Sequence, residues 1–216
     1  MSYTLVVFDW DGTLMDSAAR IVSCFQAAAR EVGLPIPDPE RARGIIGLGL
    51  REAFVRLFPR AGEPELDRLS EAYRDQFLHR DGTASALFPG VARGLGQLKS
   101  ESFLLAIATG KARRGLDRAL RETGLDGLFS ASRCVDEAVS KPHPRMLLDI
   151  LAETGTEPGQ AGMVGDTTFD MTMASAAGVD GLAVSYGAHP IDALLALRPK
   201  ACLDDFEAVV RWLCDN

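Results

Sequence analysis

The chain has 216 residues, of which 47% are hydrophobic and 25% charged, as is ordinary for a globular protein with one large domain or one domain carrying an insertion. Its net charge of −7, with no run of five or more Lys and Arg residues, argues against binding to nucleic acid or an anionic membrane surface. No uncharged stretch reaches the roughly 18 residues that a membrane span needs, and no basic leader precedes the first apolar run, so we expect a cytoplasmic protein.

The first apolar run, from Tyr3 to Phe8, has the composition of a buried strand and ends at two acidic residues. Asp9 and Asp11 are one residue apart, so their side chains can share a face, and Gly12 then permits a turn. Two carboxylates at this spacing repel each other unless a cation or a proton intervenes. The alternative is an acidic turn that closes an ordinary strand, because Asp-Gly is a common turn dipeptide.

Residues 16–85 show helical periodicity and no strand pattern. Apolar residues are spaced as on one helical face over residues 21–32, and similar patterns cover residues 50–58 and 66–78. A glycine-punctuated apolar segment, residues 44–50, separates the first two patterns. We therefore expect an all-helical domain inserted into the rest of the chain.

From residue 86 onward helical and strand patterns alternate, which is typical of parallel β-α-β units. Residues 1–15 and 86–216 are therefore predicted to form an α/β core with a doubly wound, Rossmann-like parallel sheet. In such a sheet ligands bind outside the carboxyl ends of the strands, so polar residues that follow strands are candidate site residues. Besides the first strand, we expect strands at residues 104–108, 128–131, 163–165, 182–184 and 201–203, and helices near residues 91–100, 112–123, 144–153, 168–177, 190–197 and 205–214.

Two loops of this core could bind an anion. Thr109, Gly110 and Lys111 follow the strand at 104–108, where a hydroxyl group and the amides at a helix start favour phosphate. Alternatively, Thr109 is only the N-cap of the next helix. Lys141 precedes Pro142 in a conformationally restricted loop, where its charge could offset that of a phosphate. Alternatively, Lys141 is a solvated loop lysine.

Further acidic residues follow the strand at residues 163–165, where Asp166 and Asp170 are separated by one helical turn. Carboxylates from two strand ends favour a hard cation with oxygen ligands. Asp9, Asp166 and a bound phosphate ester together offer the ligands that Mg²⁺ prefers. Mg²⁺ is therefore the predicted cofactor.

Jointly, these motifs resemble those of haloacid dehalogenase superfamily phosphatases, in particular the phosphoglycolate phosphatase-like branch with its small helical cap domain. The four motifs are Asp9-Trp10-Asp11-Gly12-Thr13, Thr109-Gly110-Lys111, Lys141-Pro142 and Gly165-Asp166-Thr167-Thr168-Phe169-Asp170. Each is weakly specific alone, whereas their order along nearly the whole chain is highly specific. The resemblance implies a phosphoric monoester hydrolase for a small phosphorylated metabolite, with residues 16–85 as the cap.

By this resemblance, Asp9 is the nucleophile that forms an aspartyl phosphate with the substrate. Asp11 is the general acid and base, which protonates the leaving group and then activates the hydrolytic water. Mg²⁺ is held by Asp9, by Asp166 and by the main-chain carbonyl of Asp11.

The resemblance also implies supporting roles. Thr109, Gly110 and Lys141 bind the transferring phosphoryl group, Gly12 permits the turn, and Asp170 supports the metal or positions Lys141. Related phosphatases often carry Asn where this chain has Gly110, so only backbone contact is expected there.

The cap is expected to close over the site and read the leaving group, with Arg43, Gly47 and Leu48 as candidate substrate contacts. Alternatively, Ile45, Ile46 and Leu48 form the core of the cap while Arg43 is solvated.

Three functions remain open on the sequence. The leading one is a phosphatase for a phosphoglycolate-like, sugar or nucleoside monophosphate, and the second is a phosphotransferase of the β-phosphoglucomutase type. The third is a non-catalytic regulatory protein, against which the intact acids argue. Retention of Asp11 argues against dehalogenase chemistry. The sequence carries no indication of the oligomeric state.

Overall fold

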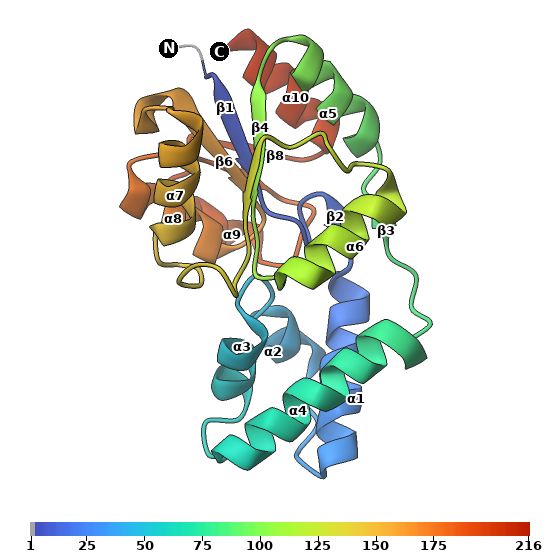
Figure 1. Ribbon diagram of the computed structural model, residues 1–216. Coiled ribbons are helices and arrows are strands. Elements are labelled where there is room, and N and C mark those ends of the chain that lie inside the picture. The colour runs from blue at the N-terminus through green and yellow to red at the C-terminus, as the bar shows by residue number, and fades with distance from the viewer. Residues whose placement is uncertain (1–2) are drawn as a thin grey trace.

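The fold combines a six-stranded sheet, helices on both of its faces, and a separate group of helices beyond the carboxyl ends of its strands (Figure 1). The computed structural model describes residues 3–216. The strands are β1 (Leu5–Phe8), β2 (Met15–Asp16), β3 (Ala86–Leu87), β4 (Leu104–Ala108), β5 (Ala131–Arg133), β6 (Ala161–Gly165), β7 (Asp180–Val184) and β8 (Ala201–Leu203). The helices are α1 (Ala18–Val32), α2 (Pro39–Arg43), α3 (Leu50–Leu57), α4 (Glu63–Asp75), the π-helical turn η1 (Gln76–Arg80), α5 (Val91–Ser100), α6 (Arg113–Thr123), α7 (Arg145–Thr154), the 3₁₀ turn η2 (Pro158–Gln160), α8 (Thr168–Ala177), α9 (Ile191–Leu195) and α10 (Phe206–Asp215).

The six-stranded sheet is parallel throughout, with the strand order β5-β4-β1-β6-β7-β8. β1 lies in the middle, and Val7 pairs in register with Ala106 of β4 and Met163 of β6. The chain adds β4 and β5 on one side of β1 and then crosses to add β6, β7 and β8 on the other. This order is that of a doubly wound sheet, so the predicted fold class is confirmed.

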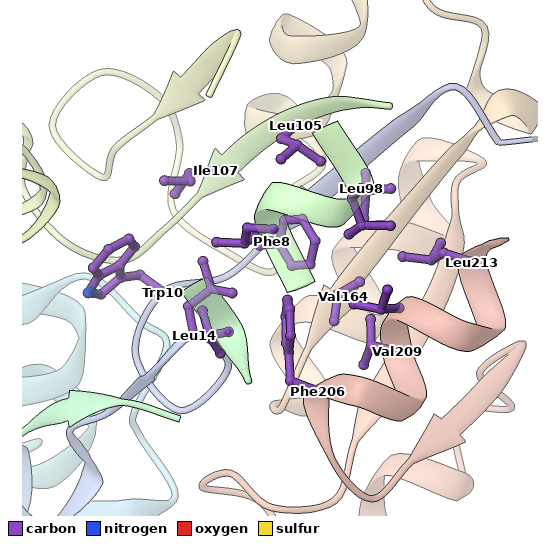
Figure 2. Packing of buried hydrophobic residues seen from close by; sticks show 14 of the residues in the cluster. Phe8, Trp10, Leu14, Leu98, Leu105, Ile107, Val164, Phe206, Val209 and Leu213 are labelled. Atoms are coloured by element: carbon purple, nitrogen blue, oxygen red, sulfur yellow. The ribbon is translucent and has the colours of Figure 1, made fainter. Parts of the chain in front are cut away.

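Side chains of β1 alternate between two apolar clusters because successive residues of a strand point to opposite faces. Val6 and Phe8 pack on the face covered by α5, α6 and α10. Figure 2 shows Phe8 and Trp10 in this cluster, with Phe206 of α10 close to Phe8. Leu5 and Val7 pack on the opposite face, with α7 and α8. Burial on both faces explains why this strand reads as a continuous apolar run rather than an alternating one.

The helices α1 to α4 and the turn η1, together called the cap helices, share an apolar cluster, into which Ala188 and Phe169 of the core also pack. Phe25 of α1 lies at its centre, with its ring 5.1 Å from that of Phe54 and 4.8 Å from that of Tyr73. Such aromatic contacts contribute about 0.5–1.5 kcal/mol each beyond simple burial. The helical insertion predicted from periodicity is thus a packed unit beyond the carboxyl ends of the strands (Figure 1).

The chain passes between the sheet and the cap helices twice, and the two passages are paired with each other. Met15 and Asp16 of β2 form an antiparallel ladder with Leu87 and Ala86 of β3. The expectation of no strand within residues 16–85 is therefore wrong at Asp16. A strand of two residues is too short to leave a periodic pattern in the sequence.

β5 also differs from its expected position, since it spans Ala131–Arg133 rather than residues 128–131. Leu128 and Phe129 pack against the core from the preceding loop, so their apolar character does not mark a strand. Among residues 3–216, no helix has both the length and the apolar character required to cross a membrane.

Candidate active site

Three loops meet at the carboxyl ends of the central strands. Asp9 follows β1, Thr109 follows β4 and Asp166 follows β6, and these strands are neighbours in the sheet. The chain crosses from one side of β1 to the other at this point, and in doubly wound sheets such a crossing is where ligands bind. The fold thus brings together residues that are far apart in the sequence.

A buried lysine links two of the acidic residues. Lys141 has 0% exposure, and its Nζ lies 2.8 Å from Oδ1 of Asp9 and 2.7 Å from Oδ1 of Asp170. Both contacts are close ion pairs rather than well-aligned hydrogen bonds. The neighbouring acids raise the pKa of Lys141 against the opposing effect of its burial, so it carries its charge. The alternative of a solvated loop lysine is wrong.

The two carboxylate oxygens of Asp9 have different surroundings. Oδ1 accepts a hydrogen bond of 2.7 Å from the backbone N–H of Trp10 and faces Lys141. Oδ2 is buried and has no hydrogen-bond partner among the described residues. Burial raises the pKa of Asp9 well above its usual range; Lys141 opposes this rise, while Asp170 and Asp166 add to it. An unpaired buried oxygen of this kind is available to a ligand or to a reacting atom.

The indole of Trp10 lies in the apolar cluster (Figure 2), so this side chain points away from the two acids that flank it. This placement follows from the alternation of side chains along an extended segment.

Asp166 is held by one hydrogen bond to each oxygen. Thr13 Oγ1 donates to Oδ1 over 2.7 Å, and the backbone N–H of Ala188 donates to Oδ2 over 2.7 Å. Burial raises the pKa of Asp166 from 3.8 to about 7, and the negative charge of Asp170 adds to this rise. Since a carboxylate can accept about four hydrogen bonds, lone pairs remain on both oxygens.

Gly12 has a second role beside the expected turn. Its φ of +85° lies in the left-handed region, where residues with a side chain are rarely found. A Cβ atom at this position would also lie 2.2 Å from Oδ2 of Asp166. Asp166 could therefore not occupy its place beside Asp9 if residue 12 carried a side chain.

Asp170, at the start of α8, uses both oxygens to hold its neighbours. Oδ2 accepts hydrogen bonds from the backbone N–H of Thr167 over 3.0 Å and from Thr167 Oγ1 over 2.7 Å, whereas Oδ1 faces Lys141. Ligand atoms of Asp9, Asp166 and Asp170 lie within 4.8 Å of one another. Oδ2 of Asp9 and Oδ1 of Asp170 have no hydrogen-bond partner among the described residues, and a group of carboxylates of this kind suits a hard divalent cation. Whether Asp170 supports a metal or positions Lys141 stays a prediction, and its contact with Lys141 is compatible with the second role.

The side chain of Asp11 lies outside this cluster and forms a second polar group. Lys111 Nζ is 2.8 Å from each of its oxygens, and Ser17 Oγ donates to Oδ1 over 2.6 Å. The amine of Lys111 also lies 5.1 Å from the ring centre of Phe77, in the turn η1 of the cap helices. The sequence places Lys111 near the site but does not indicate that it pairs with Asp11, and it does not mark Ser17 as a site residue.

Thr109 is buried, but it is not a helix cap. Its Oγ1 accepts a hydrogen bond of 3.2 Å from the backbone N–H of Lys111, and α6 begins only at Arg113, with Ala112 as its N-cap residue. The backbone N–H of Arg113 donates instead to Oδ1 of Asp136. The alternative in which Thr109 is only the N-cap of the next helix is therefore wrong, whereas phosphate binding by Thr109 and Gly110 stays a prediction.

The three candidate residues of the cap lie against the core in different ways. Arg43 donates to the carbonyl oxygens of Ala188 over 3.2 Å and Gly187 over 3.3 Å. Gly47 approaches Thr167, and the carbonyl oxygen of Leu48 approaches the loop after β4. Their contact with a substrate stays a prediction.

The apolar side chains of the same segment are turned inward. Ile45, Ile46 and Leu48 are all buried in the apolar cluster of the cap helices. The alternative in which these three side chains form the core of the cap is therefore correct. The backbone carbonyls of Gly47 and Leu48 lie against Gly110, in the loop after β4.

Comparison with known proteins gives three kinds of match. The sequence model of the family described as Haloacid dehalogenase-like hydrolase matches residues 6–184. The chain is 36% identical over 212 residues to a protein named Probable phosphatase IndB from Dickeya dadantii, covering 95% of this chain and 91% of that protein. It is 30% identical over 222 residues to a phosphoglycolate phosphatase from Psychrobacter arcticus, covering 99% and 96%. A crystal structure of a predicted phosphoglycolate phosphatase from Haemophilus somnus 129pt has a TM-score of 0.87 at 25% identity and covers 98% of both chains.

Proposed function

The chain belongs to the haloacid dehalogenase-like hydrolase family and is a phosphatase of its phosphoglycolate phosphatase-like branch; from this premise we propose that it depends on Mg²⁺ and hydrolyses a small phosphorylated metabolite. We further propose that residues 1–15 and 86–216 form the catalytic core and that residues 16–85 act as its cap domain. The observation that carries this proposal is the buried contact of Lys141 with both Asp9 and Asp170, beside Asp166. A surface cluster of acids would need no such buried lysine.

Asp9 is the proposed nucleophile. Its carboxylate oxygen attacks phosphorus, a P–O bond forms to Asp9, and the bond from phosphorus to the leaving oxygen breaks. Lys141 supplies a fixed positive charge at this point, and Thr109 offers a hydroxyl group at the end of the adjacent strand. Mg²⁺, held by Asp9 and Asp166, would supply the further positive charge that lets an anionic nucleophile approach an anionic phosphate.

Asp11 is the proposed proton carrier. It donates a proton to the departing alkoxide oxygen, and in the second half-reaction it removes a proton from the water that attacks the aspartyl phosphate. Ser17 and Lys111 hold its carboxyl group in place through the three contacts described above. Lys111 and Ser17 are therefore proposed as positioning residues for Asp11.

Replacing Asp11 with asparagine is expected to separate the two half-reactions. Because p-nitrophenolate is a good leaving group, its release needs little protonation, whereas hydrolysis of the aspartyl phosphate still needs a base. Rapid mixing of the variant with p-nitrophenyl phosphate should therefore give a burst of about one nitrophenolate per enzyme molecule, followed by slow turnover. Slow turnover with no burst would contradict the assignment of Asp11 to the second half-reaction.

The effect of Mg²⁺ on stability is expected to depend on pH. The pKa of Asp166 is raised to about 7 in the folded protein, so the metal-free fold holds a proton that the unfolded chain releases above its ordinary pKa of 3.8. The unfolded state thus binds fewer protons in this window, and stability falls as the pH rises through it. With a divalent cation bound, Asp166 would be ionised without this loss of stability.

Saturating Mg²⁺ should therefore raise Tm more at about pH 8 than at about pH 5, as measured by calorimetry. In an Asp166→Asn variant this difference should disappear. Equal shifts in Tm at both pH values in the unmodified protein would contradict the proposed metal site.

The proposed function is tested by measuring kcat/KM for a panel of phosphorylated metabolites with Mg²⁺ and with a chelator. The panel should include 2-phosphoglycolate, sugar phosphates and nucleoside monophosphates, and activity should require the metal. Product analysis distinguishes the alternative phosphotransferase, since a mutase converts a sugar phosphate into its isomer whereas a phosphatase releases inorganic phosphate. No metal-dependent phosphate release from any member of the panel would overturn the proposal.

A further inference from the structure

Gly110, in the loop after β4, touches the backbone of the cap. A Cβ atom at this position would lie 2.6 Å from the carbonyl oxygen of Leu48 and 2.7 Å from that of Gly47. Real Cβ atoms do not approach other atoms so closely, and a backbone carbonyl cannot rotate away as a flexible side chain can. The segment of residues 44–49, called the cap loop below, therefore occupies the space that a side chain at residue 110 would need.

Two glycines of the cap loop make matching contacts with other loops of the core. A Cβ atom at Gly47 would lie 3.1 Å from Cγ2 of Thr167, and a Cβ atom at Gly49 would lie 2.4 Å from Cγ2 of Val135. The backbone N–H of Gly49 also donates to Ser140 Oγ, in the residue before the buried lysine, over 3.2 Å. Three glycines, Gly47, Gly49 and Gly110, thus form one contact between the cap loop and the core, which we call the glycine seat.

The glycine seat lies directly at the proposed reaction site. Thr109 precedes Gly110, Lys141 follows Ser140, and Thr167 follows Asp166. Contact between the cap loop and these loops therefore limits the space around a phosphoryl group bound to them. The size of this space decides which leaving groups fit, because protein interiors are close-packed and have few voids.

We propose that Gly110 is a specificity-determining residue. Because it has no side chain, the cap loop can pack directly against the core. With the cap loop in this position, the enzyme selects phosphate esters with a small leaving group. This inference rests on the proposed function and extends it to the size of the substrate. The backbone of Gly110 is outside the left-handed region, so alanine is compatible with its conformation. The expected cost of Gly110→Ala is therefore the steric clash of the new Cβ atom with the cap loop.

Gly110→Ala should lower kcat/KM for 2-phosphoglycolate at least about tenfold, since overpacking a closed contact weakens it on that scale. Hydrolysis of p-nitrophenyl phosphate, whose aromatic leaving group is larger, should fall much less. The ratio of the two kcat/KM values should therefore shift at least about tenfold toward the larger substrate. Gly115→Ala in α6 is the matched control, because a Cβ atom there meets nothing within 4 Å.

A second readout does not depend on turnover. Hydrogen exchange of residues 44–50 reports on the seated loop because the amide of Gly49 is bonded across to Ser140. This exchange should be at least about tenfold faster in Gly110→Ala than in the unmodified protein, and unchanged in Gly115→Ala. An unchanged midpoint of urea unfolding in Gly110→Ala would show that the fold itself is intact.

A paired variant tests whether seating, rather than residue 110 alone, is responsible. Gly49→Ala should have the same two effects, because its Cβ meets a methyl group of Val135. Adding Val135→Ala removes that methyl group and should restore both the kcat/KM ratio and the slow exchange. The same second substitution should not rescue Gly110→Ala, whose clash is with backbone carbonyls.

The outcomes separate this inference from the proposed function. If Gly110→Ala leaves both the substrate ratio and the exchange rate unchanged in an active enzyme, the glycine seat does not determine specificity. If the unmodified protein releases phosphate from no member of the metabolite panel, the proposed function fails, while the exchange experiment still decides whether Gly110 seats the cap loop. Faster exchange with an unchanged ratio would overturn the specificity role.

Discussion

Replacing Asp9 with asparagine is expected to lower kcat for p-nitrophenyl phosphate by at least about 10⁴-fold, the scale seen when one member of a catalytic unit is removed. An amide is a poor nucleophile, and it cannot form the acyl phosphate. The same substitution should leave the fold as stable as before or more stable. Burial raises the pKa of Asp9 well above its usual range, so the ionised group is itself unfavourable in the fold.

Kinetics and unfolding should therefore be measured on the same preparation. Loss of kcat with an unchanged or raised Tm would assign the effect to chemistry rather than to folding. Asp126→Asn makes the identical chemical change at an exposed loop residue and should alter neither quantity. Asp9→Asn retaining appreciable turnover would exclude Asp9 as the nucleophile.

The second large effect is expected at Lys141, where methionine keeps much of the volume but removes the charge. The contacts with Asp9 and Asp170 would be lost, and the buried acids would remain without their cation. Breaking a buried pair in this way costs about 3–5 kcal/mol of stability. Activity should fall with it, because the variant lacks the charge that we propose to face the phosphoryl group.

This loss of stability should depend on pH in a defined direction. The pKa values of Asp9 and Asp166 are already raised, and removing the lysine charge raises them further. Between the unfolded and folded pKa values the unfolded state binds fewer protons, so the variant loses stability as the pH rises. Urea unfolding should therefore show a larger difference from the unmodified protein at about pH 8 than at about pH 5.

Lys99→Met, at an exposed position in α5, is the control for a change from lysine to methionine and should show no such dependence. A destabilisation of Lys141→Met that is the same at both pH values would mean that the buried acids are not held by its charge.

The sheet could be predicted because its sequence pattern is strong and local. Residues 104–108 and 201–203 are strands with the expected bounds, and the long apolar run of β1 leaves little choice of structure. The acidic residues could be placed at one edge because parallel strands end there together. The strands β2 and β3 could not be predicted, because a strand of two residues is too short to show a periodic pattern.

The sequence predicts which residues form the site better than it predicts which of their side chains contact each other. Lys111 and Asp11 are 100 positions apart, and nothing in either local sequence states that they are partners. Ser17 looks like any polar residue at the start of a helix. Gly110 stood out as a departure from related sequences, but the reason for it lies in the backbone of Gly47 and Leu48, which no local pattern encodes.

The short ladder between β2 and β3 has a consequence for how such proteins diversify. Because Asp16 pairs with Ala86, the insertion leaves and re-enters the core at hydrogen-bonded neighbours. The entropy of closing a loop grows only slowly with its length, by about 0.6 kcal/mol per doubling, so the core tolerates inserts of very different size at this point. The sheet could therefore keep its strand pairing while the inserted segment changes in length, because both ends of the insert stay at the same two paired strands.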